Sequence, residues 1–141
     1  RIDAGPDYYI PIGTAYELNF NPVKEEGLNH YCWEQLDSAE ITSDNFGPNN
    51  VIGSMTRSLS PSDIPTRTIP NINRILSNNL TQENPGLNSA WETVPLVGRD
   101  LNWGLTVRKE LNSFNQIAQD AIKISALATS GPFIINSQNT L

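Results

Sequence analysis

His30, Cys32 and Glu34 are three residues whose types and spacing could do chemistry. They alternate along one segment, so on a β-strand they would project from the same face, where imidazole, thiolate and carboxylate groups could hold a metal ion. A structural zinc site needs more ligands than these, and the chain contains no second histidine or cysteine. We therefore expect a half-exposed strand face and not a metal centre.

Cys32 could also act as a nucleophile, which would require a base within hydrogen-bonding reach. The only histidine is His30, and side chains two residues apart on a strand run parallel without meeting. We therefore expect an inert thiol. Zinc proteolysis needs the sequence H-E-x-x-H, which is absent, and no nucleophile–base pair or carboxylate dyad is recognisable from spacing. The sequence predicts no catalytic residue and no enzyme activity in this chain.

Four carboxylates could gather at one end of a β-sandwich: Glu25, Glu26, Asp37 and Asp100. Calcium is bound by several oxygen ligands, and loops of extracellular sandwiches often supply them. These residues are the candidates for a calcium site. The alternative, which we favour, is ordinary solvated loop charge, and we expect no other cofactor.

Exposed aromatic rings can stack on sugars, and Tyr8, Tyr9 and Trp91 are the candidates for such a ligand platform. The alternative is that these rings pack inside the domain or cover the edge of a sheet. Packing is the role that we favour, because aromatic side chains dominate the energetics of protein cores.

The composition restricts the partners of the chain. It has 141 residues, enough for a single domain spanning 1–141, and a net charge of −6, which repels the phosphate backbone of nucleic acids. No apolar run is long enough to cross a membrane as a helix. The chain starts at Arg1 without a signal peptide, so we interpret it as a processed product or a fragment of a larger protein.

Period-two alternation of apolar and polar residues predicts strands at both ends of the chain. One strand covers residues 8–20 with a break near Pro11, and a second covers 30–36 with Trp33 facing the core. Near the C-terminus, Leu101–Val107 and Ala121–Leu127 predict a hairpin joined by a polar loop. The loop would run through residues 112–115, Trp103 would join Trp33 in one core, and Phe133–Ile135 would form a last short strand or a linker.

The middle of the chain, residues 38–95, holds six of the ten prolines. A short helix is predicted at Asn71–Asn79, and short strands near 51–57 and 65–69. We expect residues 46–95 to be ordered and packed over the sandwich, because their apolar side chains would not stay exposed in a soluble domain. The side chains expected to be buried are Ile52, Met55, Leu59, Ile64, Ile69, Ile72, Ile75, Leu76, Leu80, Leu87 and Trp91.

Arg57, Arg67 and Arg99 lie in or beside this proline-rich excursion. Arginine pairs with carboxylates through two parallel hydrogen bonds, so these residues are predicted to tie the long loops to the sheet, with substrate recognition as the alternative. Two strands, a long return and two further strands predict an all-β fold. The specific expectation is an Ig-like, Greek-key β-sandwich with a long Pro-rich excursion containing a short helix.

Several segments resemble, in order, one known family. Residues 10–18 are similar to its first strand, and Tyr31–Asp37 is similar to its Y-C-W-E-Q-x-D signature. Further similar segments are Arg57–Pro61, Pro65–Pro70, Trp91-Glu92, Val94-Pro95, residues 98–103, residues 105–108 and Ser130–Phe133. The chain thus resembles the β-sandwich accessory domain that follows the catalytic domain in bacterial secreted metallopeptidases of the reprolysin-like zincin type.

This resemblance implies a secreted or cell-surface domain whose partners are neighbouring domains of the same chain, among them a zinc protease domain. The leading expectation is a non-catalytic support module, and the alternative is a module that binds glycan or an extracellular protein substrate. Relatives often carry an Asp-rich loop after the first strand and an Asp after the L-T-V-R strand. Here Asn21–Gly27 and Lys109 stand at those places, which weakens an inherited calcium site.

Overall fold

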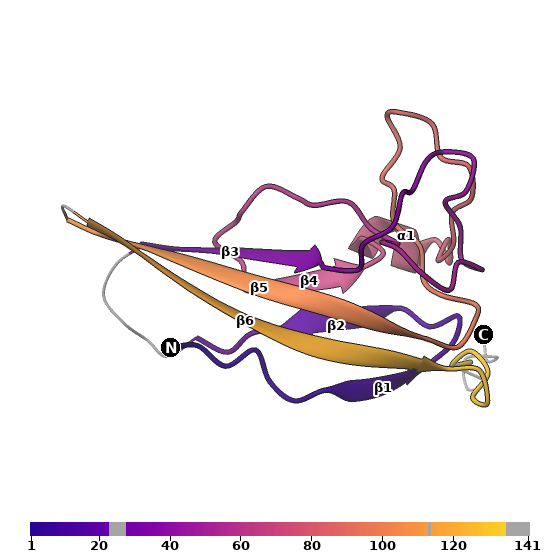
Figure 1. Ribbon diagram of the computed structural model, residues 1–141, viewed down its shortest axis with the longest axis horizontal. Coiled ribbons are helices and arrows are strands. Elements are labelled where there is room, and N and C mark those ends of the chain that lie inside the picture. The colour runs from indigo at the N-terminus through magenta and orange to yellow at the C-terminus, as the bar shows by residue number, and fades with distance from the viewer. Residues whose placement is uncertain (23–27, 113, 135–141) are drawn as a thin grey trace, which may run out of the picture.

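The computed structural model describes residues 1–22, 28–112 and 114–134, and it consists mainly of β-strands in two sheets (Figure 1). The larger sheet has the strand order β1-β6-β5-β3, and the smaller sheet pairs β2 with β4. The strands are β1 (Tyr8–Pro11), β2 (Tyr16–Asn19), β3 (Leu28–Gln35), β4 (Thr66–Ile69), β5 (Arg99–Leu111) and β6 (Phe114–Leu127). The all-β prediction is confirmed.

The connections switch repeatedly between the two sheets. β1 lies parallel to β6, whereas β6 and β5, β5 and β3, and β2 and β4 are antiparallel pairs. Each step from β1 to β5 along the chain therefore moves to the other sheet, and only β5 and β6 are consecutive neighbours. The described helix is too short to cross a membrane.

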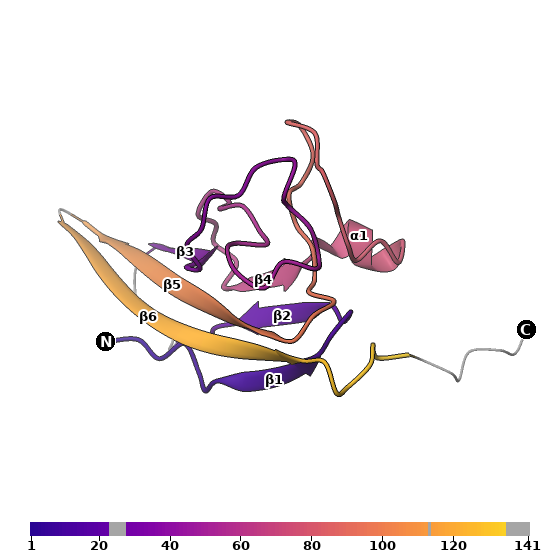
Figure 2. The same cartoon turned by 45° about the vertical axis from the view of Figure 1, so that its right-hand side comes forward.

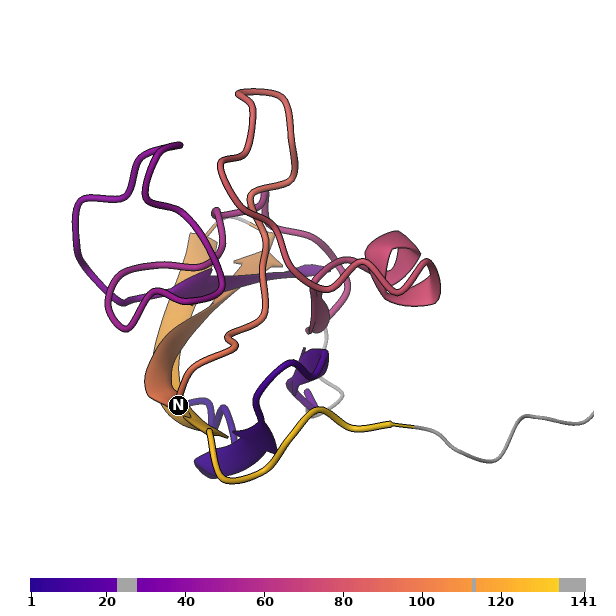
Figure 3. The same cartoon turned by 90° about the vertical axis from the view of Figure 1, so that its right-hand side faces the viewer.

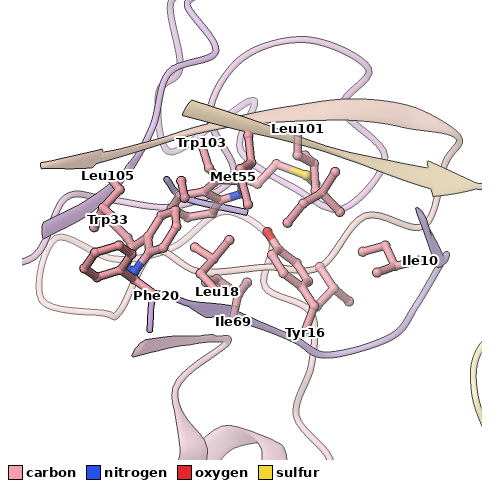
Figure 4. Close-up of a cluster of buried hydrophobic side chains, with 14 of the residues drawn as sticks. Ile10, Tyr16, Leu18, Phe20, Trp33, Met55, Ile69, Leu101, Trp103 and Leu105 are labelled. Carbon is pink, nitrogen blue, oxygen red and sulfur yellow. The ribbon is translucent and has the colours of Figure 1, made fainter. Parts of the chain in front are cut away.

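The core lies between the two sheets, as Figure 4 shows. Trp33 from β3 and Trp103 from β5 are both buried in it, which confirms the prediction of one core containing two tryptophans. The ring of Tyr16 meets the ring of Trp103 edge-on, with centroids 6.4 Å apart. Leu18 follows Tyr16 on the same face of β2 and is fully buried, so the alternation of this segment was interpreted correctly.

The break in the first extended segment separates β1 from β2 and moves the chain from one sheet to the other. Gly13 adopts a φ of 65°, a left-handed conformation that suits glycine. A β-carbon at this position would lie 3.3 Å from side-chain atoms of both Leu96 and Pro132. The sharp turn after Pro11 therefore depends on the absence of a side chain.

The C-terminal hairpin is longer than predicted, and the expected polar loop at 112–115 is wrong. β5 continues to Leu111 and β6 already starts at Phe114, with these two residues paired. The far half of the hairpin lacks an apolar alternation because most of its side chains are exposed, so the sequence there did not predict strands. Figure 1 shows this end reaching beyond the other strands. Of the predicted last segment, Phe133 and Ile134 form no strand, and Ile135 lies outside the described residues.

The short helix in the excursion, α1 (Ile72–Leu76), starts as predicted, because the Asn71 side chain accepts a hydrogen bond from the Arg74 N–H. It ends earlier than expected and buries none of its residues. Ile72 is 53% exposed and Leu76 is 78% exposed, so the prediction that they press against the sheet is wrong. Figure 3 shows α1 to one side of both sheets.

The rest of the excursion is packed only in part. The strand predicted near 65–69 exists as β4, whereas residues 51–57 contribute only a single bridge between Thr56 and Glu92. Met55, Ile69 and Trp91 are buried, but the expectation of general burial is wrong. Polar contacts hold the excursion in place, as described below, and they leave six of the predicted apolar side chains exposed: Ile52, Leu59, Ile64, Ile72, Leu76 and Leu87.

Candidate functional site

His30, Cys32 and Glu34 project from one face of β3 as predicted, but they have separate surroundings. His30 Nε2 lies 3.9 Å from Glu110 Oε1 on the adjacent strand, and the Cys32 thiol donates a hydrogen bond to the Leu59 carbonyl at 3.5 Å. Burial, and secondarily the charge of Glu34, raises the pKa of the Cys32 thiol, which disfavours the nucleophilic thiolate. Across residues 1–22, 28–112 and 114–134, no three His, Cys, Asp or Glu side chains form a metal-holding group.

Of the four calcium candidates, Glu25 and Glu26 lie outside the described residues. The Asp37 carboxylate already accepts several hydrogen bonds. Gln35 Nε2 donates to its Oδ2 at 2.7 Å, and the backbone and side-chain amides of Asn102 donate to Oδ2 and Oδ1 at 3.0 and 2.6 Å. Calcium at Asp37 would have to displace these donors.

Asp100, the fourth calcium candidate, accepts a hydrogen bond from the Ser125 hydroxyl at 2.7 Å. Its neighbour on the same strand, Arg99, lies with Nη2 3.7 Å from Asp37 Oδ2. A guanidinium so close to a carboxylate makes the site less favourable for a cation. Calcium binding stays a prediction, with Asp37 engaged in an ion pair.

The three aromatic candidates do not form one platform. Tyr9 is 72% exposed, whereas Tyr8 is half-buried and donates its O–H to the Glu17 carbonyl at 2.9 Å. Trp91 is only 5% exposed, and its candidacy as an exposed ring is wrong. The Trp91 ring packs against Phe46, with centroids 5.2 Å apart, and under the guanidinium of Arg57 at 3.8 Å. It forms a small core inside the excursion.

Two tyrosines, the buried Tyr16 and the half-buried Tyr8, make the folded chain sensitive to alkali. Burial, with a smaller contribution from Glu17, raises the pKa of Tyr8 to about 12 from its usual 10.0, and burial raises the pKa of Tyr16 further. A phenol whose pKa is raised by folding stabilises the native state fully below pH 10 and loses that contribution as the pH rises through the folded value. We expect the urea midpoint to fall steeply above pH 10, and Tyr16→Phe to flatten that fall. An unchanged profile in Tyr16→Phe would contradict this assignment.

Gln35 connects the larger sheet to the excursion, a structural role that the sequence analysis did not predict. It lies at the end of β3, where its Oε1 accepts the backbone N–H of Met55 at 2.8 Å while its Nε2 binds Asp37. The hydroxyls of Ser54 and Thr56 lie within hydrogen-bonding distance of the same oxygen, at 3.4 and 3.3 Å. The sequence offered one indication: Gln35 lies two residues after Trp33, on the same face of the strand, and a polar side chain on a core-facing side needs hydrogen-bond partners. The end of β3 is thus attached to the excursion through Gln35.

Arg99 makes a second attachment between sheet and excursion. Its guanidinium donates to the carbonyls of Asn50 and Gly53, at 3.0 and 2.7 Å, while pairing with Asp37. Burial lowers the pKa of Arg99, and Asp37 opposes that shift. At Gly53 φ is 81°, and a β-carbon would lie 2.6 Å from Ile41 Cδ1, so the loop can follow this path only with glycine.

Arg67 makes a third attachment, which is also buried. Its Nη1 donates to the Trp33 carbonyl and its Nη2 to the Arg57 carbonyl, both at 2.8 Å. Nη2 also lies 3.4 Å from the Glu92 carboxylate, and both side chains are buried. Its guanidinium carbon lies 5.3 Å from the centre of the Trp103 ring. The predicted attachment of the long loops to the sheet is confirmed for Arg67 and Arg99, whereas the Arg57 side chain contacts Trp91 within the excursion.

Arg74 was not singled out from the sequence, yet it attaches α1 to the rest of the excursion. Its guanidinium donates to the carbonyls of Glu92 and Thr81. Arg67 and Arg74 therefore reach Glu92 through different groups, the carboxylate and the backbone carbonyl. Backbone carbonyls are the usual acceptors in these attachments, which makes the partners invisible in the sequence.

The outer face of the larger sheet carries a shallow hollow, where small residues face each other across β5 and β6. It lies over Gly104 of β5 and Ala121 of β6, beside Thr106 and Gln119. Leu36 covers part of Gly104, where a β-carbon would lie 3.1 Å from the leucine. The hollow is open to solvent, and its shape does not define a ligand.

Comparisons with known proteins identify no relative: no family model, curated protein or solved structure matches this chain. The function is therefore argued from the geometry of the described residues, and the resemblance described above serves as a hypothesis.

Proposed function

We propose that this chain is a non-catalytic accessory domain that supports a neighbouring domain in a secreted bacterial protein of the zinc metallopeptidase type. The proposal includes an Ig-like, Greek-key arrangement of its two sheets. A support role requires a well-packed body rather than a reactive cleft, and the two sheets of this chain pack around one core.

The observation that supports the proposal most directly is the use of the signature segment. Trp33 lies in the core and donates its ring N–H to the Pro65 carbonyl at 2.9 Å, Gln35 holds Met55, and Asp37 holds Arg99. The most distinctive residues of the chain therefore make internal contacts between the sheets and the excursion. Such contacts favour a shape that is kept constant, as a spacer or support would need.

The switching of the chain between the sheets supports the Ig-like part of the proposal. Consecutive strands up to β5 alternate between sheets, and the first and last strands of the chain are neighbours in the larger sheet. Greek-key sandwiches likewise depend on long returns between two sheets. Figure 2 shows the loops before and after β4 extending to one side of this pair of sheets.

A second candidate function, binding of a protein partner, is favoured by the exposed apolar side chains of the excursion. Leu59, Ile64 and Leu87 are each more than half exposed, on loops that the arginine contacts hold in place. Exposed apolar residues on fixed loops are common at binding surfaces. A glycan ligand has less support, because Trp91 is buried and Tyr9 alone remains well exposed.

The absence of catalysis is testable with the purified chain. We expect no cleavage of casein or gelatin and no zinc retained after dialysis, because the sequence offers one histidine and one cysteine. Elemental analysis and a protease assay measure these, with His30→Ala as the matched variant. Stoichiometric zinc that disappears in His30→Ala would overturn the proposal. Co-sedimentation of the intact chain with gelatin would replace the support role by the binding role.

A further inference from the structure

The far half of β6 forms an edge of the larger sheet. β1 pairs with β6 only from Ile124 to Leu127. From Phe114 to Gln119, β6 is paired with β5 on one side, and none of the described residues forms a strand on the other side. This edge belongs to the part of the hairpin that extends to the far left in Figure 1.

One hydrogen bond shows which residues of β6 point their backbone N–H and C=O groups toward this edge. The N–H of Lys123 donates to Asp7 Oδ1 at 2.8 Å, so it points away from β5. Because backbone direction alternates along a strand, the N–H and C=O groups of Asn115, Ile117 and Gln119 also point outward. Their neighbours Gln116 and Ala118 point toward β5.

Two other edge positions of the larger sheet are covered. On β3, Tyr31 exchanges two backbone hydrogen bonds with Ser62, at 2.7 and 3.0 Å. On β6 itself, Asp7 covers Lys123, and the Asp120 carboxylate accepts from the backbone of Ala4 and Ala121. The covered stretch of β6 thus begins where the stretch Asn115–Gln119 ends.

The composition of Phe114–Gln119 lacks the charges and the proline that discourage edge strands from pairing with other chains. Ile117, at the centre of this stretch, is 58% exposed. In a chain with a net charge of −6, these six consecutive uncharged residues would not repel the same stretch of a second copy.

We propose that this edge binds a second copy of the chain, with the two β6 strands antiparallel across Asn115–Gln119. A two-fold axis places each residue of a strand against the same strand of the partner, so a charge near the axis would meet a like charge. This stretch has none. The outward N–H and C=O groups of one copy meet those of the other around Ile117, and the two larger sheets become continuous. This inference is independent of the support role proposed above.

The test is the oligomeric state of the 141-residue chain, measured by sedimentation velocity from low micromolar to about 1 mM protein. We expect a monomer–dimer equilibrium. Ile117→Pro removes an outward N–H without removing a bond to β5, and should weaken dimerisation at least about tenfold. Ile117→Lys places two lysines near the axis and should also weaken dimerisation. It keeps the proposal testable if the proline variant does not fold. Leu87→Lys, on an exposed loop, is the matched control and should still dimerise.

Amide hydrogen exchange identifies the interface itself. In concentrated samples Asn115, Ile117 and Gln119 should become protected, while Gln116 and Ala118 are protected at every concentration. A chain that stays monomeric at the highest concentration overturns the proposal. So does a dimer that persists in both Ile117 variants, and so does one that Leu87→Lys disrupts, which would place the contact on the loops. A monomer that binds added β-strand peptides along 115–119 would replace the second copy by a foreign strand.

Discussion

Trp103→Ala is expected to lower the free energy of unfolding by about 3 to 5 kcal/mol. Trp103 is completely buried between the two sheets, where Figure 4 places it beside Met55 and across from Tyr16. Its removal leaves a cavity lined by residues of both sheets, and takes away the ring that faces the Arg67 guanidinium. Urea unfolding followed by circular dichroism measures this change.

Two further variants separate the size of the cavity from the loss of an aromatic ring. Trp103→Phe keeps a ring in the core and should lose clearly less stability than the alanine variant. Leu87→Ala, at a side chain that is 85% exposed, should change the free energy of unfolding by less than about 0.5 kcal/mol. A Trp103→Ala variant as stable as Leu87→Ala would mean that the two sheets do not share this core.

The core could be predicted from the sequence because alternation reports directly which face of a strand is buried. Tyr16 and Leu18 occupy every second position of β2, and Trp33 and Trp103 continue the same rule on β3 and β5. The burial of each of these residues could be predicted from the alternation of its immediate neighbours in the sequence. The same rule failed for the far half of β6, where both faces are largely exposed and no alternation exists.

The excursion could not be predicted in the same way because it is held by contacts that the sequence does not encode locally. Arg99 reaches the carbonyls of Asn50 and Gly53, nearly fifty residues earlier in the chain. Any residue can supply a carbonyl, so no pattern marks the partner. Ile72 and Leu76 illustrate the consequence: their helical spacing predicts a buried face, yet Arg74 attaches α1 to the loop at Thr81, and the helix buries none of its residues.

The candidate sites show the same division. That His30, Cys32 and Glu34 share a face follows from strand geometry alone and was predicted. That His30 faces Glu110 depends on the register of β3 with β5, which the sequence does not give. Asp37 was considered as a calcium ligand because loop carboxylates at one end of a sandwich can supply the oxygen ligands. Its pairing with Arg99 became visible only in the folded chain.

Arg67→Met is expected to lower the free energy of unfolding by about 3 to 5 kcal/mol, because it leaves the buried Glu92 carboxylate without its cation. The substitution also leaves the carbonyls of Trp33 and Arg57 without their donor. Methionine retains most of the apolar stem, so the change mainly reports the loss of the guanidinium. Arg108→Met removes an arginine from an exposed position of β5 and is the matched control.

A double-mutant cycle with Glu92→Gln tests whether Arg67 and Glu92 act as a pair. If they do, the double variant should be more stable than the sum of the single changes predicts, by about 1 to 3 kcal/mol. The glutamine side chain keeps an acceptor for the backbone N–H of Asn71, which now lies 3.3 Å from the carboxylate, so the cycle reports mainly the charge. Strictly additive effects, or an Arg67→Met variant no less stable than Arg108→Met, would show that the excursion is held without this ion pair. Loss of the pair should also expose the excursion to proteases before the sheets unfold, since Arg67 connects Arg57 and Glu92 of the excursion to Trp33 of the sheet.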